Sequence, residues 1–497
     1  MLAAPDKSHS EPPSVHRAPA AGDSQREVFR VARVAHWNLV AQSLDRVDRW
    51  NRGYHRRLHD IYRWLIPAGQ RVLEIGSGTG DLLAAVRPHV GVGVDFSPEM
   101  VRAARQRHPD LRFVIGDAHE LNLGETFDWI VLSDLVNDVW DVQEVFARAR
   151  AHAGPHTRMV LNFYSRLWEL PLRLVKRVGG ARPMLDQSWL TFHDIDNLLE
   201  LAGCEVVRHS VEILWPLKTP VVAPLCNRVL AKIWPCSMMA LTHVVVARPE
   251  RGADGLARRP LVSVVVPARN EEGNVPQIFQ RVPELAGGTE LILVEGHSSD
   301  GTFNAIEREI ASRPGGRYIS LRQTGTGKGN AVREGFARAS GDILVILDAD
   351  LTVAPEDLPR FIEALVSGRG EFVNGVRLVY PMEQRAMRFF NLIGNKFFSL
   401  VFSWLLGQPV KDTLCGTKAL WKRDYERIVA DRAYFGDFDP FGDFDLLFGA
   451  AKLSRKIIEM PIRYRQRTYG ETQIQRWRHG LLLLRMSVIG ARKLRCV

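Results

Sequence analysis

The chain has 497 residues, of which 46% are hydrophobic and 25% charged, and its formal net charge is +10 at pH 7. That length exceeds what one hydrophobic core organises, so two or three domains are expected, and the composition excludes a disordered or fibrous protein. The positive balance favours anionic partners: nucleotide-sugar phosphates, an anionic membrane surface or nucleic acid.

The cysteines and the first residues bear on the compartment. Five cysteines are scattered along the chain without any C-x-x-C pair. They support neither a zinc site nor a disulfide framework, and a reducing cytoplasm suits them. Residues 1–25 are polar and rich in Pro and Ala, which predicts a disordered tail without a secretory signal. Because no uninterrupted apolar run reaches about 20 residues, we do not expect a membrane-spanning helix.

A glycine-rich turn is the main feature of the N-terminal half. Apolar residues recur at near-helical spacing from Arg26 to Leu65, which predicts helix. A short strand then carries Glu74 into a G-x-G-x-G turn formed by Gly76, Gly78 and Gly80, and a helix follows. Glycines in such a turn let the backbone approach a ligand closely, at the positive end of the helix dipole.

Three more polar side chains follow predicted strands in this half. Asp95, Asp117 and Ser133 each lie at or just past the end of a short apolar run. Asp95 comes roughly twenty residues after Glu74, which is the spacing at which an acid meets a ribose diol in a βαβ nucleotide site. These side chains are therefore expected at one edge of a sheet, beside the glycine turn.

The glycine turn and the acids together resemble class I S-adenosylmethionine-dependent methyltransferases over about residues 30 to 248. The resemblance implies that the turn and Glu74 face the methionine part of the cofactor S-adenosylmethionine. It also implies that Asp95 holds the ribose hydroxyls, that Asp117 lies by the adenine amine, and that Ser133 belongs to the same cofactor site. An alternative stays open, in which this half is a nucleotide-binding α/β domain that transfers no methyl group.

The methyl acceptor is not identified by the sequence. Methyl transfer is an in-line displacement at a sulfonium carbon, so alignment and a deprotonated acceptor are its main requirements. Asp134, Asn137 and His36 are candidates for acceptor contacts. Residues 164–190, rich in Trp, Leu and Arg, are expected to cap the acceptor pocket. The apolar residues 215–239 are expected to line a pocket, a domain interface or a membrane-facing patch.

A pair of aspartates is the main feature of the C-terminal half. An apolar run of strand length, Ile343 to Leu347, ends in Asp348-Ala349-Asp350. Alternation along a strand points both carboxylates the same way. In an open parallel sheet, ligands bind beyond the carboxyl ends of the strands. Two carboxylates there suit a hard divalent cation that clamps a diphosphate, although an isolated pair is more often a solvated turn.

Further motifs show that the aspartate pair is not isolated. Pro267-Ala-Arg-Asn-Glu271 follows one predicted strand, Glu295-Gly-His-Ser-Ser-Asp-Gly follows another, and Gly-Lys328-Gly precedes the pair. The glycines around Lys328 do not form a Walker A loop, because a glycine follows the lysine directly. In this order the motifs resemble glycosyltransferase family 2, with its GT-A fold, from about Leu261 to the C-terminus. The polyprenyl- or dolichyl-phosphate mannosyl- and glucosyltransferases fit best.

This second resemblance implies roles for named residues. Pro267, Glu271 and Glu295 would form the nucleotide pocket, Lys328 would lie near the diphosphate, and Asp348 and Asp350 would bind it through Mg²⁺ or Mn²⁺. Two positions depart from the family pattern. Glu295 stands where the family usually has Asp, and Thr352 stands where relatives often carry Gln beside the metal.

Polar residues farther along the chain match acceptor-side motifs of the same family. Arg377 matches a phosphate ligand, and residues 412–418 match a segment near the acceptor. Asp443 and Asp445 match the acidic segment that supplies a base in many relatives, and Arg467 matches a segment that closes over the donor. A hydroxyl acceptor needs such a base. A phosphate acceptor is already anionic, and then Arg377 and Arg467 become the more important residues.

The expected fold class is α/β, with a Rossmann-like methyltransferase sandwich in residues 26–248, a linker in residues 249–260 and a GT-A nucleotide-sugar-binding fold in residues 261–497. The expected activity is inverting sugar transfer from a UDP- or GDP-sugar to a lipid-phosphate or glycan acceptor, together with methyl transfer, in cell-envelope or glycan biosynthesis. The alternative is that one domain is catalytically silent and serves as a binding or scaffold module.

Two apolar stretches raise the question of membrane contact. Residues 389–406 and 480–497 suit interfacial helices whose cations meet anionic headgroups, and core packing is the alternative for each. The expected location is the cytoplasm, with peripheral contact at the inner face of the plasma membrane. A nucleic-acid methyltransferase is not expected, because the sequence shows no aromatic-basic stacking platform.

Overall fold

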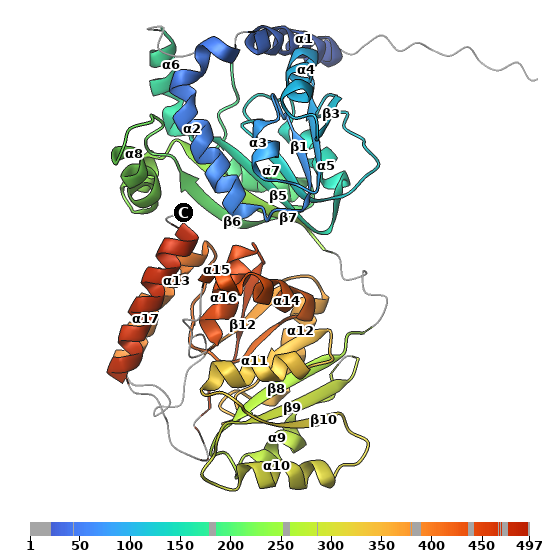
Figure 1. The fold of residues 1–497 in the computed structure, drawn as a ribbon, viewed down its shortest axis with the longest axis vertical. Coiled ribbons are helices and arrows are strands. Elements are labelled where there is room, and N and C mark those ends of the chain that lie inside the picture. Colours follow the sequence, from blue (N-terminus) through green and yellow to red (C-terminus); the bar gives the residue numbers. More distant parts are fainter. Residues whose placement is uncertain are drawn as a thin grey trace, which may run out of the picture.

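A computed structural model describes most of the chain and shows two α/β units, one after the other along the sequence (Figure 1). The described residues are 21–42, 44–177, 185–251, 259–285, 287–377, 379, 389–435, 442–465, 467, 469 and 476–495.

The first sheet has seven strands in the order β3-β2-β1-β4-β5-β7-β6. Neighbours from β3 to β5 are parallel, whereas β7 runs antiparallel to both β5 and β6. The strands are β1 (Arg71–Ile75), β2 (Val90–Asp95), β3 (Arg112–Ile115), β4 (Phe127–Ser133), β5 (Ala153–Tyr164), β6 (Cys204–Glu212) and β7 (Thr242–Pro249). The central strands are Val-, Leu- and Ile-rich and almost wholly buried, as expected where helices cover both faces of a parallel sheet.

The second sheet also has seven strands, in the order β10-β9-β8-β11-β13-β12-β14. Only β13 is antiparallel to its neighbours β11 and β12. The strands are β8 (Val262–Ala268), β9 (Thr289–Glu295), β10 (Tyr318–Arg322), β11 (Ile343–Ile346), β12 (Phe372–Val376), β13 (Lys418–Trp421) and β14 (Ile457–Pro461). Both sheets place the polar residues predicted to follow strands, such as Asp95, Ser133 and Glu295, at the carboxyl ends of parallel strands, whereas Asp443 and Asp445 lie on a helix.

Helices cover both sheets and form a buried core on each face. Those of the first unit are α1 (Ala21–Gln42), α2 (Leu44–Leu65), α3 (Asp81–Ala85), α4 (Pro98–Arg107), α5 (Val142–Ala151), α6 (Glu169–Arg177), α7 (Phe192–Leu201) and α8 (Val222–Pro224), with helical turns η1 (Arg166–Trp168), η2 (Leu225–Val229), η3 (Leu230–Lys232) and η4 (Cys236–Met239). Those of the second unit are α9 (Val275–Arg281), α10 (Thr302–Ala311), α11 (Lys328–Arg338), α12 (Leu358–Val366), α13 (Phe389–Leu406), α14 (Lys422–Ala430), α15 (Arg432–Phe435), α16 (Asp443–Lys452) and α17 (Arg476–Gly490), with turns η6 (Pro355–Asp357) and η7 (Ala491–Arg495).

The start of the chain differs from the sequence prediction in two respects. Residues 1–20 of the predicted tail lie outside the described residues, but α1 already begins at Ala21, because Ala21 and Gln25 are good helix formers and extend the helix by about a turn. The helical run from Arg26 to Leu65 is divided into α1 and α2. The two helices run in different directions (Figure 1) and pack on different elements, α1 on α4 and α2 on α3.

The two units meet through a buried carboxylate. Glu371, directly before β12, is 1% exposed, and its Oε2 accepts a hydrogen bond from Nη2 of Arg158 on β5 at 2.5 Å. Arg251 and Arg455 also lie within 3.1–3.3 Å of the Glu371 Oε1 atom. Burial opposes ionisation of Glu371, but Arg158, Arg455 and Arg248 outweigh it and hold its pKa well below the ordinary value.

The contact at Glu371 fixes which edges of the two sheets face each other. Arg158 pairs with Trp129 near the start of β4, and Glu371 precedes the first residue of β12. Both therefore lie at the amino ends of the parallel strands. The carboxyl ends, where ligands bind in such sheets, lie on the far side of each sheet from the other unit.

Candidate active sites

The glycine turn after β1 has the backbone that only glycine adopts readily. Gly76, Gly78 and Gly80 have φ of 74°, 49° and 74°. A Cβ on Gly76 would lie 2.8 Å from Leu135 Cδ1, and one on Gly80 would overlap the ring of Phe113. A Cβ on Gly78 would meet nothing within 4 Å, so the backbone there borders open space. The turn thus leaves room for a ligand against Gly78.

Glu74 carries an unsatisfied acceptor beside this turn. The residue is 3% exposed, and its Oε2 atom has no hydrogen-bond partner among the described residues. Burial raises the pKa of Glu74 well above its ordinary value, and the neighbouring Asp95 and Asp81 add to the effect. A buried acceptor without a partner is costly, so a cationic or N–H-donating ligand group would relieve it. The α-amine of S-adenosylmethionine is a group of that kind.

Asp95 connects the end of β2 to the glycine turn and to α1. Its Oδ2 accepts from Gly78 N and its Oδ1 from Ser97 N, both at 2.9 Å. Burial raises the pKa of Asp95 to about 6. The hydroxyl of Ser97 donates to Asn38 Oδ1 at 2.7 Å, which draws α1 over this edge of the sheet. Asn38 was missed by the sequence analysis, since a single Asn on an amphipathic helix carries no signal.

Asp117 follows β3, the neighbour of β2. It is half-buried, and its Oδ1 accepts from the backbone N of His119 at 2.9 Å and lies 2.6 Å from His119 Nδ1. Burial alone would raise the pKa of Asp117, but these contacts outweigh it and lower the pKa. The acid is therefore held ionised at the edge where the adenine contact was expected.

A buried polar network lies where β4 ends. Asp134, with φ of 53°, accepts from the Tyr54 hydroxyl at 2.7 Å and from Asn162 Nδ2 at 2.5 Å. Asn162 Oδ1 accepts from Ser133 Oγ at 2.9 Å and from the Tyr62 hydroxyl at 2.7 Å. Burial raises the pKa values of Asp134 and Tyr54. Both tyrosines lie within the near-helical pattern of residues 26–65, whose spacing does not distinguish a core residue from a site residue.

The other two acceptor candidates have different surroundings. Asn137 donates from Nδ2 to Ser188 O at 2.7 Å, so it anchors residues 185–190 of the predicted cap over the loop after β4. Arg33 of α1 reaches the same region, donating to Asp186 O at 2.6 Å. His36 makes an edge contact with the ring of Trp37, and no described contact ties it to the site. Residues 185–190 are thus held by α1 and by the loop after β4, whereas residues 178–184 of the predicted cap lie outside the described residues.

In the second unit, the first carboxylate of the pair is held by a lysine. Nζ of Lys328, the first residue of α11, lies 2.5 Å from Asp348 Oδ1. Burial opposes ionisation of Asp348, but Lys328 and then Lys418 outweigh it and lower its pKa. A Cβ on Gly416 would overlap both Lys328 Nζ and Asp348, so a glycine there lets the two groups meet.

The second carboxylate is held by an arginine. Asp350 Oδ2 accepts from Arg467 Nη2 at 2.7 Å, and its Oδ1 accepts from the Thr352 hydroxyl at 2.8 Å. Arg467 Nη1 also lies 3.5 Å from Glu271 Oε1. The structure therefore brings together Glu271, Asp350 and Arg467, which are far apart in sequence. Thr352, a departure from the family pattern, stabilises the turn at Asp350.

Pro267 and Glu295 lie at the same edge of the sheet. In the parallel pairing of β8 with β9, Pro267 is opposite Val294 and Ala268 is opposite Glu295. Glu295 Oε1 accepts from Ser298 N at 2.5 Å. Its longer side chain, compared with Asp, is thus used to close the loop after β9.

Arg377 and Asp445 each have an ionic partner that the sequence did not predict. Arg377 donates from Nε and Nη2 to the two carboxylate oxygens of Asp412, at 2.7 and 2.8 Å. Burial works against the charge of Arg377, but Asp412 raises its pKa. Asp445 Oδ2 accepts from Arg432 Nε at 2.9 Å.

Asp443, the other base candidate, is the first residue of α16, and its side chain lies outside the described residues. The start of α16 is nonetheless placed close to the Gly-Lys-Gly turn. A Cβ on Gly442 would lie 2.6 Å from the Cα of Gly329. The acidic segment therefore begins beside the turn that carries Lys328.

Comparison with known families identifies both units. Residues 72–156 match the model of a methyltransferase domain, and residues 263–428 match that of glycosyl transferase family 2. The chain contains a methyltransferase domain and a family 2 glycosyltransferase domain. The predicted pair of folds is confirmed, and each match includes the motifs at its sheet's ligand edge that carried the prediction.

Curated relatives match the glycosyltransferase domain. The undecaprenyl-phosphate 4-deoxy-4-formamido-L-arabinose transferase of Enterobacter sp. (strain 638) is 29% identical over 217 residues, which are 43% of this chain and 62% of that protein. The dolichol-phosphate mannosyltransferase of Pyrococcus furiosus is 29% identical over 220 residues, 43% of this chain and 59% of that protein. The chain thus spans less than two thirds of the length of these relatives.

Solved structures match the methyltransferase domain at low similarity. The magnesium protoporphyrin IX methyltransferase of Synechocystis PCC 6803 is 18% identical, with a TM-score of 0.31, over 44% of this chain and 98% of that one. An S-adenosylmethionine-dependent methyltransferase of Mesorhizobium loti is 19% identical, with a TM-score of 0.31, over 38% of this chain and 96% of that one.

The carboxylate pair of the glycosyltransferase domain can be tested for its fit to a metal ion. Mg²⁺ is commonly held by one or two carboxylates together with substrate phosphates and waters. Asp348 and Asp350 supply two carboxylates, but no group of three or more His, Cys, Asp or Glu converges anywhere in the described part of the chain. Lys328 and Arg467 also hold one carboxylate each. Two carboxylates are too few to enclose a metal ion alone. They fit a metal ion whose remaining ligands are the phosphates of a bound diphosphate and waters.

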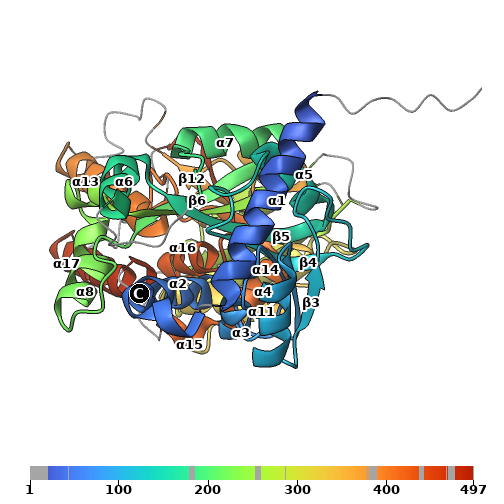
Figure 2. The ribbon, with the colours of Figure 1, turned by 90° about the horizontal axis from the view of Figure 1, so that it is seen from above.

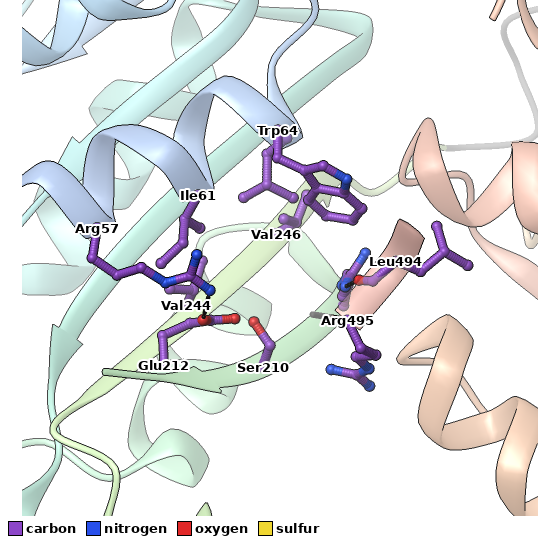
Figure 3. Close-up of a pocket in the computed structure, with 11 residues that line it drawn as sticks. Arg57, Ile61, Trp64, Ser210, Glu212, Val244, Val246, Leu494 and Arg495 are labelled. Atoms are coloured by element: carbon purple, nitrogen blue, oxygen red, sulfur yellow. Dashed lines mark hydrogen bonds and ion pairs between the residues drawn. The ribbon is translucent and has the colours of Figure 1, made fainter. Parts of the chain in front are cut away.

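A pocket lies between the methyltransferase and glycosyltransferase domains (Figure 3). Arg57 donates to Glu212 at 3.2 Å on one side of it, and Arg495 of η7 lines the other. Burial, with Arg495 adding, lowers the pKa of Arg208 in its wall to about 9. The Arg208 guanidinium donates to Leu494 O at 3.1 Å, across the two domains. This pocket is at the domain seam, away from both ligand edges.

Proposed function

We propose that the chain is a bifunctional enzyme of cell-envelope or glycan biosynthesis. Its glycosyltransferase domain transfers sugar, with inversion, from a UDP- or GDP-sugar to a lipid phosphate. Its methyltransferase domain transfers a methyl group from S-adenosylmethionine. The observation that carries the proposal is the meeting of Lys328 with Asp348 and of Arg467 with Asp350, where β11 ends. We place the methyltransferase domain in residues 26–248 and the glycosyltransferase domain in residues 261–497, which is supported by the end of β7 at Pro249 and the start of β8 at Val262.

Sugar transfer requires that negative charge on the leaving diphosphate be stabilised. A Mg²⁺ or Mn²⁺ ion bound by Asp348 and Asp350 would neutralise part of that charge as a Lewis acid. Lys328 supplies a further positive charge from the start of α11, within 2.5 Å of Asp348. Arg467 can exchange a carboxylate partner for a phosphate oxygen, since a guanidinium binds both in the same geometry. Pro267, Glu271 and Glu295 form the wall where the nucleotide would lie.

The acceptor decides whether a base is needed. The curated relatives are named for undecaprenyl phosphate and dolichol phosphate, which supports a polyprenyl phosphate here. A phosphate oxygen is already anionic, so it attacks the anomeric carbon from the face opposite to the leaving group without losing a proton. The Asp412-bound Arg377 is then the candidate for orienting the acceptor. If the acceptor were a glycan hydroxyl, Asp445 or Asp443 would have to take its proton.

Methyl transfer would take place in the N-terminal domain, at the carboxyl ends of the parallel strands. S-Adenosylmethionine, when bound, supplies an electrophilic methyl group on a sulfonium. Glu74 would hold its amine, Asp95 its ribose hydroxyls and Asp117 its adenine, with Gly78 lining the open space between them. Asp134, held by Tyr54 and Asn162, is the candidate that faces the acceptor.

Two substitutions in the full-length protein test the proposal. Asp350→Ala should abolish sugar transfer and leave methyl transfer and S-adenosylmethionine binding intact, whereas Asp95→Ala should do the reverse. Calorimetric titration with S-adenosylmethionine, and with UDP- and GDP-sugars in the presence of Mn²⁺, measures the two sites separately. Loss of both activities in both variants would contradict two independent sites. Failure of one domain to bind any of its ligands would favour a silent binding or scaffold module.

A further inference from the structure

Most of the exposed large apolar side chains in the described residues lie on four segments. We call their combined surface the flank surface, and define it as η1–α6 (166–177), the segment 215–239, α13 and α17–η7 (476–495). Its exposed apolar side chains are Leu167, Leu170, Leu174, Trp215, Val221, Val222, Leu225, Val229, Ile233, Trp234, Met238, Met239, Phe397, Leu400, Leu481, Leu484 and Val488. Apolar side chains that gather on the surface of a soluble protein usually mark an interaction site.

The apolar side chains are arranged as stripes on helices. Leu170 and Leu174 of α6, which are 74% and 63% exposed, are one helical turn apart. Leu481 and Leu484 of α17, 70% and 47% exposed, are related in the same way. On α17 the opposite face is buried, since Leu483 and Met486 belong to the core. The helix is thus apolar on both faces, although only one of them has a partner in the described structure.

The four segments lie on one side of the molecule. Figures 1 and 2, which are turned by 90° from each other, both place α6, α8, α13 and α17 on the same flank. Hydrogen bonds connect them: Trp168 Nε1 donates to Met239 O at 3.0 Å, and Trp404 Nε1 of α13 donates to Lys232 O at 2.8 Å. The second bond crosses from the glycosyltransferase domain to the methyltransferase domain. The segments of the flank surface are therefore joined by hydrogen bonds within and between the two domains.

The charge of these segments is strongly one-sided. They contain fourteen lysines and arginines and a single acidic residue, Glu169. Glu212 neutralises Lys232 and Glu169 pairs with Arg173, so the remaining twelve give these segments a large positive excess. Apolar side chains flanked by Lys and Arg, with tryptophans such as Trp234 (77% exposed), are the composition of a surface that inserts among anionic headgroups.

We propose that the flank surface docks onto an anionic lipid bilayer, and that the methyltransferase domain contributes to the docking through α6 and the segment 215–239. A second copy of the chain fits this surface poorly. In a two-fold dimer the same patch faces itself, and here that would bring the cations of both copies together. The proposal does not require either transferase activity. The sequence already led us to expect interfacial helices at residues 389–406 and 480–497, in the glycosyltransferase domain. The new part is the contribution of the methyltransferase domain, which is argued from the exposure and charge of its side chains.

Vesicle sedimentation with the full-length protein tests the docking. We expect binding to vesicles of phosphatidylcholine with phosphatidylglycerol, weaker binding to phosphatidylcholine alone, and weakening by salt. Leu170→Glu with Leu174→Glu alters the methyltransferase side, and Leu481→Glu with Leu484→Glu the glycosyltransferase side. Each pair should lower vesicle affinity at least about tenfold, because two leucines leave the lipid and two anions face it.

Control variants alter exposed apolar residues away from the flank surface, Leu201 (60% exposed) and Val429 (38% exposed). Leu201→Glu on α7 and Val429→Glu on α14 should bind vesicles as the unaltered protein does. Since all the altered side chains are exposed, unchanged thermal denaturation midpoints will show that the variants fold. Absence of binding to the anionic vesicles, or full binding by the α6 variant, would overturn the proposal. So would analytical ultracentrifugation showing a dimer that the flank variants dissociate.

Discussion

The ammonium of Lys328 lies 2.5 Å from a carboxylate oxygen of Asp348, at the end of the strand that carries the aspartate pair. If this charge stabilises the leaving diphosphate, Lys328→Met should lower kcat for sugar transfer by about 10²–10³-fold, as loss of one preorganised charge contact does in other enzymes. Release of nucleoside diphosphate measures the rate. Arg102→Met on α4 of the methyltransferase domain, which removes a 65% exposed cation away from the flank surface, is the control and should leave the rate unchanged.

The elevated pKa of Asp95, about 6, gives S-adenosylmethionine binding a pH dependence. An ionised carboxylate accepts hydrogen bonds from ribose hydroxyls better than a protonated one does. We therefore expect affinity to fall as the pH decreases through about 6, which calorimetric titration will measure. Asp95→Asn, which does not ionise, should bind weakly and without that inflection. An unchanged inflection in this variant would assign it to another group.

The same ionisation of Asp95 lowers folding stability as the pH rises, whereas it raises the affinity for S-adenosylmethionine. The pKa of Asp95 is higher in the folded protein than in the unfolded chain, so the folded state holds its proton to higher pH. Stability from this group is therefore present at low pH and is lost as the pH rises through about 6. Urea denaturation on both sides of that pH should show a smaller decrease for Asp95→Asn than for the unaltered protein.

Alanine substitutions at Gly78 and Gly69 distinguish the cost of backbone strain from the loss of space for the ligand. Both have positive φ, 49° and 78°, and a Cβ on either would meet nothing within 4 Å. Alanine at each should cost a similar ~1–2 kcal/mol of backbone strain. Only Gly78→Ala should in addition weaken S-adenosylmethionine binding, because its methyl group enters the space beside Glu74 and Asp95. Equal affinities of the two variants would show that the ligand lies elsewhere.

Glu371 should be the most sensitive position at the domain interface. Glu371→Gln removes the buried counter-charge of Arg158, whereas Arg248 and Arg455 keep Glu205 and Asp424, and breaking a buried pair of this kind typically costs about 3–5 kcal/mol. Chemical denaturation will measure the loss. Glu356→Gln removes a more exposed pair with Arg281 in the same domain and should change stability by no more than ~1 kcal/mol.

The sequence predicted the parts of this protein that are local in the chain. Buried strands such as β8 and β11 are short apolar runs, and the residues that follow them fall at the carboxyl edge by the rules of parallel sheets. Partners that are distant in sequence were not predictable. Nothing in the sequence around Arg377 indicates that Asp412 binds it, because that contact depends on how the chain returns after α13.

The same limitation applies to the methyltransferase domain and the interface. Tyr54 lies on a helical stripe that is equally consistent with core packing, and only the fold brings it to Asp134. Helices α1 and α2 run in different directions (Figure 1) and pack on two different helices, which the periodicity of the sequence does not report. Arg158 and Glu371 are 213 residues apart, so their contact appears only once both domains are placed.

The buried contact between Arg158 and Glu371 turns the two ligand edges away from each other, and this has a kinetic consequence. A molecule that leaves one site must diffuse around the protein before it reaches the other. If both reactions act on one substrate, the first product should mix with the bulk pool, and a coupled assay should show a lag that added product abolishes. Mixing the Asp350→Ala and Asp95→Ala proteins should then restore the doubly modified product, since each reaction can be completed on a separate molecule of enzyme.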